Sequence, residues 1–330
     1  MRAIVCARYG PPDVLAIKEV DTPTPKDNEV LIKVHAASVT MGDCELRALN
    51  FPPLFRILAM LGFGFRGPRK KILGQELSGE IESVGKQVTR FKKGDQVLAV
   101  TGFHLGAYAE FDCLPEIGPI AVKPVNMSFE EAAVVPIGAL TALHFLRKGN
   151  IAQGQKIVII GAGGSIGTFA VQLARMFGAE VTAVDSAKKL EMLRSIGANR
   201  VVDYEREDFA ESGEIYDAIF DVVGKTSVSG CVRSLKENGV YLLGNPNFSQ
   251  RVGGMRSGRR VVSSVAASEA EDLAYLKQLI EAGKIRSVID KSYSLEQTAH
   301  AHEYVESGQK LGNVVIVVSR DSKTIDASSN

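Results

Sequence analysis

Three glycines spaced three residues apart, Gly161, Gly164 and Gly167, separate an apolar stretch from an amphipathic one. Residues 157–160, Ile-Val-Ile-Ile, are typical of a buried β-strand, and beyond the glycines apolar residues recur at helical spacing. Glycines at such a turn let the backbone bend sharply, approach a phosphate closely and pack a helix against the strand. The N-terminus of that helix directs free N–H groups and its positive dipole end at an anion. The turn is therefore a candidate phosphate site.

An acidic residue ends the next strand. Residues 181–184, Val-Thr-Ala-Val, predict a strand, and Asp185 follows directly. An acid at this place in a dinucleotide-binding βαβ unit accepts hydrogen bonds from ribose hydroxyls. A dinucleotide site is predicted by the whole combination of strand, glycine turn, helix, second strand and terminal acid. A glycine turn alone does not predict such a site. The turn residues expected to contact the dinucleotide are Gly161, Ala162, Gly164, Ser165, Ile166 and Gly167.

Strands and helices alternate after residue 156, which predicts a parallel, doubly wound α/β sheet. The helices are expected near 190–196 and 227–235. Further strands are expected at 200–202, 216–223, 239–243 and 260–265.

The first 124 residues have a different pattern. Short strands at 30–34, 79–84 and 96–100 are bounded by Gly, Pro, Asn and Asp, which favours an antiparallel, partly closed β domain. Ser128 and Glu131 then form a capping-box pattern that opens a helix. Strands near the C-terminus, at 288–293 and 314–318, flank a helical stretch and are interpreted as a return to the first domain. We expect a dinucleotide domain at 125–266 and a catalytic domain at 1–124 and 267–330.

Composition narrows the function classes. The 39 Lys and Arg residues balance 38 Asp and Glu, so no overall charge favours nucleic acid or an anionic membrane as a partner. The longest apolar stretch is too short to span a bilayer, and the N-terminus lacks the apolar core of a signal peptide. The 4 cysteines are dispersed without a Cys-x-x-Cys pair, as in a reducing compartment. We expect a cytoplasmic protein.

Nine segments spread over nearly the whole chain resemble one known family. They are HAASVTMGD (35–43), LGQELSGEIESVG (73–85), FKKGDQVLA (91–99), GAYAEF (106–111), VVPIGALTAL (134–143), GAGGSIG (161–167), GANRVVDY (197–204), YDAIFDVVG (216–224) and GNVVIVV (312–318). The chain resembles the medium-chain dehydrogenases/reductases, and within them the quinone oxidoreductases that lack catalytic zinc. The resemblance implies a Rossmann domain, a GroES-like β-barrel domain, and a homodimer formed through residues 260–265.

The residues at the expected metal position favour the zinc-free branch. Zinc alcohol dehydrogenases of this superfamily carry Cys where this chain has Thr40 and His where it has Gln75, and their third ligand, a Cys, has no counterpart at 125–151. A catalytic zinc needs three protein ligands of N, S or O type. His300 and His302 are two residues apart on a predicted helix and point in different directions. We expect no zinc.

Without a metal, reduction of an activated acceptor is favoured. In a quinone or an α,β-unsaturated carbonyl, the negative charge spreads through the conjugated system, so one or two neutral hydrogen-bond donors suffice. By resemblance, Thr40 lies beside the nicotinamide, Gln75 occupies the vacated ligand position and Tyr108 comes from a loop that lines the cleft. The alternative is a structural role, in which Thr40 and Gln75 form hydrogen bonds with backbone groups and Tyr108 only lines the wall of the cleft. Asp43 is expected to cap the helix that follows. Thr40 is the preferred donor.

The resemblance also implies further cofactor contacts. Thr141 matches a threonine that contacts the nicotinamide half, and Asn313 is expected near the cofactor from the C-terminal segment. The other expected contacts lie at the carboxyl ends of strands: Val222, Val223, Gly224, Gly244 and Asn245.

The choice between NAD and NADP depends on four residues. Asp185 favours NAD, because a carboxylate repels a 2′-phosphate. Ser186, Lys189 and Tyr204 match residues that surround the 2′-phosphate in NADPH-dependent quinone oxidoreductases, and Lys supplies a charge suited to phosphate. We expect NADPH, with NAD as the alternative.

Two basic clusters and one apolar stretch complete the analysis. The clusters at 66–71 and 251–260 lack interleaved aromatic residues, so we interpret them as solvated loops. The apolar stretch 51–65 is either core or a cover for an apolar substrate. The predicted activity is hydride transfer from NAD(P)H to a quinone or activated alkene. The alternatives are an alcohol or aldehyde dehydrogenase of the same fold and a cofactor-binding protein with little turnover.

Overall fold

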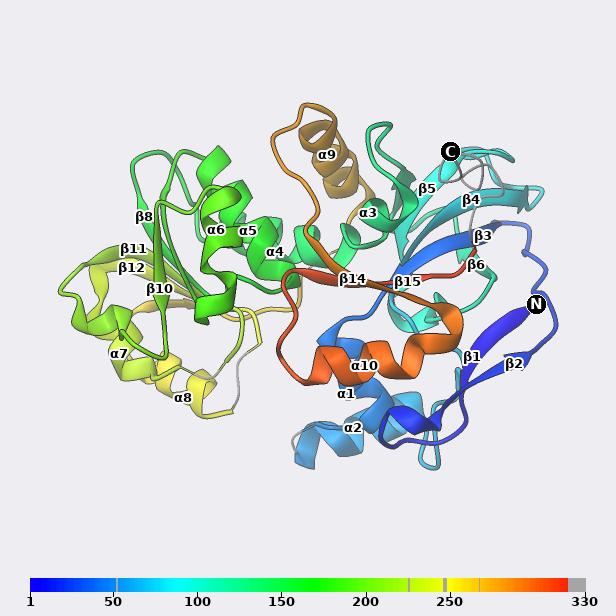
Figure 1. Cartoon of the computed structure of the whole chain (residues 1–330), viewed down its shortest axis with the longest axis horizontal. Coiled ribbons are helices and arrows are strands. Elements are labelled where there is room, and N and C mark those ends of the chain that lie inside the picture. Colours follow the sequence, from blue (N-terminus) through cyan, green and yellow to red (C-terminus); the bar gives the residue numbers. More distant parts are fainter. Residues whose placement is uncertain (52, 225, 246–247, 267, 320–330) are drawn as a thin grey trace, which may run out of the picture. The chain divides into compact units, whose positions relative to one another are not determined.

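The computed structural model of the chain describes residues 1–51, 53–224, 226–245, 248–266 and 268–319 (Figure 1). Two compact units divide the chain: unit 1 comprises residues 1–137, 269–278 and 289–330, and unit 2 comprises residues 138–268 and 279–288. These boundaries differ from those expected at 124 and 266. The C-terminal residues from 320 lie outside the described part.

Helix α3 (Phe129–Ala133) explains the later first boundary. It begins at the expected capping box: Ser128 Oγ accepts from Glu131 N at 3.1 Å, and Glu131 Oε2 accepts from Ser128 N at 2.9 Å. Ala133 and Val134 then pack into a buried cluster with residues of the first unit's sheet. The sequence predicts the capping box, but it does not reveal that the helix packs on the sheet of the first unit.

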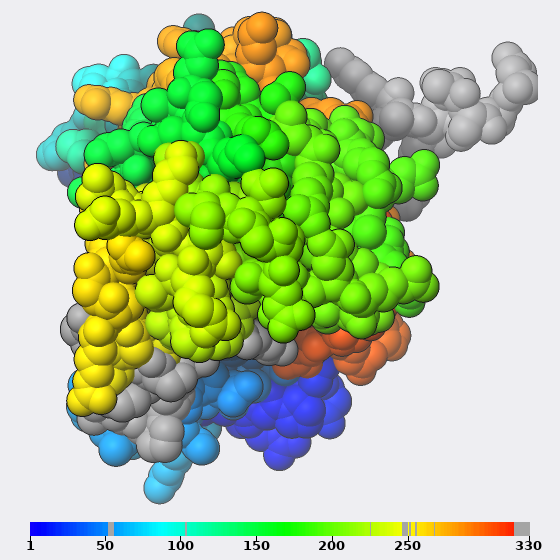
Figure 2. Space-filling view, turned by 90° about the vertical axis from the view of Figure 1, so that its left-hand side faces the viewer, coloured from blue at the N-terminus to red at the C-terminus, as the bar shows by residue number. Residues whose placement is uncertain are grey.

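Unit 2 is built on a six-stranded parallel sheet with the order β10-β9-β8-β11-β12-β13. This is the order of the doubly wound dinucleotide-binding fold, so the predicted fold class is confirmed. Figure 1 shows α5 and α6 on one side of the strands, away from α7 and α8, and Figure 2 shows this unit, green to yellow, facing the viewer. The strands are β8 (Lys156–Ile160), β9 (Glu180–Asp185), β10 (Arg200–Asp203), β11 (Tyr216–Asp221), β12 (Leu235–Leu243) and β13 (Arg260–Val262). The helices are α4 (Pro136–Lys148), α5 (Ser165–Met176), α6 (Leu190–Ser195), α7 (Val228–Arg233) and α8 (Phe248–Arg256).

Two strands of unit 2 differ from the prediction. Strand β12 begins at Leu235, four residues before the expected start, and its first residue pairs with Tyr216 across a register shift. Strand β13 ends at Val262 instead of residue 265 and forms the edge of the sheet.

Unit 1 is a mostly antiparallel β structure. Its larger sheet has the order β14-β15-β3-β4-β5-β7, with β6 paired to β3, and β1 and β2 form a separate pair. Strand β3 pairs with β15, β4 and β6 along its length, which curls the sheet as in a partly closed barrel. The strands are β1 (Arg2–Cys6), β2 (Leu15–Glu19), β3 (Glu29–Ser38), β4 (Glu76–Val84), β5 (Gln96–Val100), β6 (Phe111–Pro115), β7 (Ile120–Val122), β14 (Ile289–Ser294) and β15 (Asn313–Val317). The helices are α1 (Met41–Ala48), α2 (Pro53–Phe63), α9 (Ala270–Glu281), whose last turn belongs to unit 2, and α10 (Thr298–Glu306).

The apolar stretch at 51–65 forms α2 and the turn after it. Ile57, Leu58 and Leu61 are all more than half exposed, so the interpretation of this stretch as core is wrong for these residues. Phe63, at the end of α2, is partly buried against the core of unit 1. Pro52 and the side chains of residues 53–55 lie outside the described part. Among the described residues, no helix combines the length and apolar character that a membrane span requires.

Candidate functional site

The glycine turn of unit 2 joins β8 to α5. Gly161 N and Ala162 N donate to Val184 O at 3.0 and 3.2 Å, and Gly161 has a φ of +76°, a conformation that favours glycine. A Cβ atom at Gly167 would lie 2.4 Å from Gly161 O. Gly167 therefore allows α5 to pack directly against the end of β8.

Gly164 shows that the turn is shaped for a ligand. It is the N-cap of α5 in an extended conformation that any residue adopts, and a Cβ atom there would meet only Gly161 O, at 3.6 Å. Among the described residues, no contact requires a glycine at this position. A missing side chain at the N-terminus of a 12-residue helix, beside the half-exposed Ser165 and Ile166, fits the close approach of a pyrophosphate.

Asp185 forms a buried ion pair across this turn. Lys189 Nζ lies 3.1 Å from Asp185 Oδ1, and both residues are less than a tenth exposed. Ser186 N donates to Oδ1 at 2.9 Å and Gly163 N donates to Oδ2 at 2.8 Å. The carboxylate thus accepts three hydrogen bonds from the protein, out of about four that it can accept. Its charge is balanced locally, so it does not act as an unpaired acid toward the ribose.

Gly163 is a site residue that the sequence reasoning missed. A Cβ atom at this position would lie 2.4 Å from Lys189 Cδ and 3.0 Å from Asp185 Oδ2, so any other residue here would push the Lys189 side chain away from its present position beside Asp185. The available signal was that Gly163 directly precedes Gly164 and lies outside the spacing of three.

Four expected cofactor residues meet at the carboxyl ends of β9 and β10. Asp185 pairs in register with Asp203, and Tyr204 N donates to Asp185 O at 3.3 Å. Tyr204 is 60% exposed and Ser186 is half-buried beside the Asp185–Lys189 pair. The structure therefore brings Asp185, Ser186, Lys189 and Tyr204 to one corner of the sheet.

The loop after β11 is shaped by Asp221, a buried residue that the sequence reasoning also missed. Asp221 Oδ1 accepts from Val223 N at 3.0 Å and from Gly224 N at 2.8 Å, and Oδ2 accepts from the side chain of Gln250 at 3.0 Å. Val222 N donates to Ile160 O at 3.1 Å. The five carboxyl-edge residues Val222, Val223, Gly224, Gly244 and Asn245 are thereby gathered beside β8.

The remaining two expected cofactor residues lie in different units. Thr141 is half-buried in α4 of unit 2. Asn313 begins β15 of unit 1, is 1% exposed and pairs with Ile289 of β14.

In unit 1, Thr40 is the N-cap of α1. Thr40 Oγ1 donates to Asp43 Oδ2 at 2.6 Å, while Thr40 N donates to the same oxygen at 2.9 Å and Asp43 N donates to Thr40 Oγ1 at 3.2 Å. Asp43 is thus the cap partner that the sequence predicted. The hydroxyl proton of Thr40 is already bound, so Thr40 donates to a ligand only if this hydroxyl turns.

Gln75 is better placed as a donor. It precedes β4 and is half-buried, with Oε1 lying 3.5 Å from Thr40 Oγ1 and close to Gly42. Within the described part of the chain, its side-chain nitrogen donates to no protein group. This reverses the expected order of the two donors.

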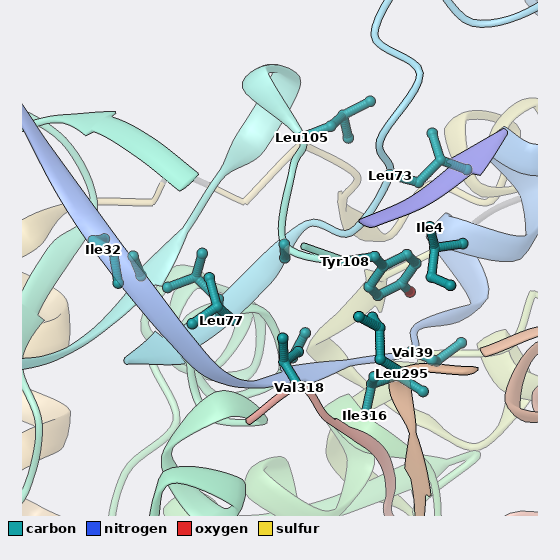
Figure 3. Packing of buried hydrophobic residues seen from close by; sticks show 14 of the residues in the cluster. Ile4, Ile32, Val39, Leu73, Leu77, Leu105, Tyr108, Leu295, Ile316 and Val318 are labelled. Atoms are coloured by element: carbon teal, nitrogen blue, oxygen red, sulfur yellow. The ribbon is translucent and has the colours of Figure 1, made fainter. Parts of the chain in front are cut away.

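Tyr108 is core, which corrects the expectation of a donor from a cleft loop. Its side chain is 0% exposed and its hydroxyl donates to Ser38 O at 3.1 Å. Figure 3 shows the ring packed among Ile4, Leu73 and other buried side chains. A hydroxyl enclosed in this way reaches no ligand.

Glu76 is a buried acid beside Gln75 whose burial the sequence did not reveal. It is 1% exposed; its carboxyl group accepts from Ser38 Oγ and, at 2.7 Å, from Ile137 N. Burial raises the pKa of Glu76 to about 8, so the carboxyl group is mostly protonated at neutral pH. Among the described residues, no group of three or more His, Cys, Asp or Glu side chains is arranged to hold a metal ion.

Comparison with known proteins agrees with both units. Residues 26–124 match the family model described as "Alcohol dehydrogenase GroES-like domain", and residues 196–316 match "Zinc-binding dehydrogenase". The 2-methylene-furan-3-one reductase of Solanum lycopersicum is 33% identical over 96% of this chain and 79% of its own length. The chloroplastic NADPH-dependent alkenal/one oxidoreductase of Arabidopsis thaliana is 30% identical over the same shares. The solved quinone oxidoreductase of Coxiella burnetii superposes with a TM-score of 0.88, at 31% identity, over 97% of this chain and 99% of that protein. The chain belongs to the medium-chain dehydrogenase/reductase superfamily, in the branch of the quinone oxidoreductases.

Proposed function

We propose that the protein reduces quinones or α,β-unsaturated carbonyl compounds with NADPH. The observation that carries the proposal is the glycine turn of unit 2, left open at Gly164 and bordered by the Asp185–Lys189 pair. The names of the relatives support the acceptor class, since a methylene-furanone reductase and an alkenal/one oxidoreductase act on conjugated carbonyls and a quinone oxidoreductase on quinones.

Gly164, Lys189 and Tyr204, with the N-terminus of α5, would hold the pyrophosphate and the 2′-phosphate of the cofactor. Gly164 and the N-terminus of α5 fit the pyrophosphate. Lys189 and Tyr204, at the ends of β9 and β10, supply a cation and a hydroxyl for the 2′-phosphate. When bound, the reduced nicotinamide is the source of the hydride.

The side chains of unit 1 act on the acceptor. Reduction of a conjugated carbonyl places negative charge on its oxygen, and the Gln75 side-chain amide stabilises that charge as a neutral donor. Thr40 is a second donor after its hydroxyl leaves Asp43. The proton that completes the product comes from solvent. No step requires a metal ion.

We expect the purified protein to oxidise NADPH only when an acceptor such as 9,10-phenanthrenequinone is added. Chelators should leave the rate unchanged, and elemental analysis should find no stoichiometric zinc, because Thr40 and Gln75 stand at the ligand positions. Tight NADPH binding without acceptor-dependent oxidation would instead identify a cofactor-binding protein. One zinc per chain, with activity lost to chelators, would contradict the metal-free mechanism.

Substitution of Lys189 tests the cofactor preference. Lys189→Ala should weaken NADPH binding by about 1–3 kcal/mol, the range for a hydrogen bond to a charged group. NADH binding should change little, because NADH has no 2′-phosphate. Titration of the cofactor fluorescence measures both affinities. The substitution also leaves the Asp185 carboxylate without its cation, so adding Asp185→Asn should restore part of the NADPH affinity. Equal losses for the two cofactors would show that Lys189 does not contact the phosphate.

A further inference from the structure

Helix α2 exposes an apolar face. Ile57 is 57%, Leu58 55% and Leu61 53% exposed, and at helical spacing these three side chains share one face. Phe65, just beyond the helix, is 60% exposed. A helix that is apolar on every side is normally buried, so an open apolar face of this size marks a surface that something covers.

The stretch of sequence that contains this face carries only positive charge. Between Glu45 and Glu76 the sequence contains no acidic residue. Five cationic residues of this stretch are exposed: Arg56, Arg66, Arg69, Lys70 and Lys71. The net charge of the whole chain, +1, conceals this local excess.

The loop that carries four of these cations is fixed to the N-terminal strand. Tyr9 donates through its hydroxyl to Gly64 O at 2.9 Å, Cys6 N donates to Lys71 O at 2.7 Å and Arg69 N donates to Phe63 O at 2.6 Å. The apolar face and these cations thus lie on one fixed segment, which we call the α2 platform (residues 56–71); of the cations, Lys71 also donates through Nζ to Ala7 O at 3.1 Å. Figure 1 shows α2 (light blue) at the periphery of unit 1.

We propose that the α2 platform docks the protein on the surface of an anionic lipid bilayer. Its apolar side chains enter the boundary between headgroups and acyl chains, and its cations contact the lipid phosphates. A second copy of this chain fits the face less well than an anionic lipid surface does, because a twofold contact would bring two positively charged clusters together. A nucleic acid would bind the cations but leave the apolar face in water. The proposal does not depend on the proposed activity.

Because the chain contains no tryptophan, a single introduced tryptophan reports on the platform. The fluorescence of the Leu61→Trp variant should shift to shorter wavelength with vesicles of phosphatidylcholine and phosphatidylglycerol, but not with phosphatidylcholine alone. High salt should reverse the shift, because surface charges are screened. Ile117→Trp, at an apolar position that is 84% exposed elsewhere in unit 1, should not respond. A shift of equal size with both kinds of vesicle would overturn the role of the cations.

Co-sedimentation with the same vesicles separates the two contributions. Arg69→Gln with Lys70→Gln should lower the partition coefficient about 30-fold, at roughly 1 kcal/mol per cation. Leu58→Ser with Leu61→Ser should lower it at least about tenfold. The control pair Lys18→Gln with Lys92→Gln, also exposed cations of unit 1, should bind as the wild type does.

Two controls separate a loss of vesicle binding from a loss of folding or of activity: the circular dichroism spectrum and the turnover of a water-soluble acceptor. Every variant should retain its circular dichroism spectrum and its turnover of that acceptor. Absence of vesicle binding by the wild-type protein would overturn the proposal. If Leu58→Ser with Leu61→Ser instead raises KM for an apolar acceptor without any vesicle binding, the face covers substrate and the proposal is wrong.

Discussion

A quinone or enone should be reduced with a kcat/KM at least about 100-fold above that of a saturated ketone of the same size. A conjugated acceptor distributes the developing charge through its own π-system. A saturated ketone concentrates the charge on one oxygen, which in this protein faces neutral donors instead of a metal ion. Each 1.4 kcal/mol of missing transition-state stabilisation costs about a factor of ten in rate. Steady-state kinetics on matched pairs, such as an enone and its saturated analogue, measure the ratio.

The two donors should contribute unequally to this rate. Gln75→Leu should lower kcat for the enone by about 100-fold without changing NADPH affinity, because it removes a side-chain nitrogen that donates to no group in the described part of the chain. Thr40→Val should have a smaller effect, since the hydroxyl is bound to Asp43, and Thr40→Ser is the control that keeps the hydroxyl. Turnover of a simple secondary alcohol at a comparable rate would contradict this mechanism, because it requires a strong electrophile.

Glu76→Gln should leave the stability of the protein nearly unchanged at acidic pH and raise it at alkaline pH. Burial raises the pKa of Glu76 to about 8, whereas the reference value is 4.5. The folded protein therefore keeps a proton that the unfolded chain releases. The stability from this proton is fully present below about pH 4.5 and is lost as the pH rises through about 8. At about 1.4 kcal/mol per pH unit, the total loss is on the order of 5 kcal/mol.

Glutamine has the shape of the protonated acid and has no charge to bury. The variant and the wild type should therefore differ by less than about 1 kcal/mol at pH 5, while the variant should be more stable by a few kcal/mol at pH 9. Urea unfolding at a series of pH values measures both curves. Glu80→Gln, on the same strand, is the control and should leave the pH dependence unchanged. Parallel curves for the wild type and Glu76→Gln would show that Glu76 is ionised in the folded protein.

The sequence by itself determined the elements that form within a few residues. The strand, glycine turn and helix at 157–176 and the capping box at Ser128 depend on backbone conformation and on hydrogen bonds between neighbours. At the start of α1 the sequence predicted Asp43 as the cap, whereas the structure makes Thr40 the N-cap and Asp43 its partner in a capping box. The alternation of strands and helices after 156 then fixed the fold class, because right-handed crossovers allow few sheet orders.

Only the tertiary structure decided how each site side chain is buried and paired. The sequence predicts Asp185 as an acid at the end of a strand. The ion pair of its carboxylate with Lys189 and its hydrogen bond from Gly163 N are visible only in the structure, which brings the end of β9 next to the turn. Tyr108 and Glu76 are polar residues that the fold encloses, whereas the apolar α2 remains exposed. Burial depends on contacts between segments far apart in the chain, which hydrophobic periodicity does not record. For the same reason, a total charge near zero did not reveal that the cations of residues 56–71 gather around an apolar face.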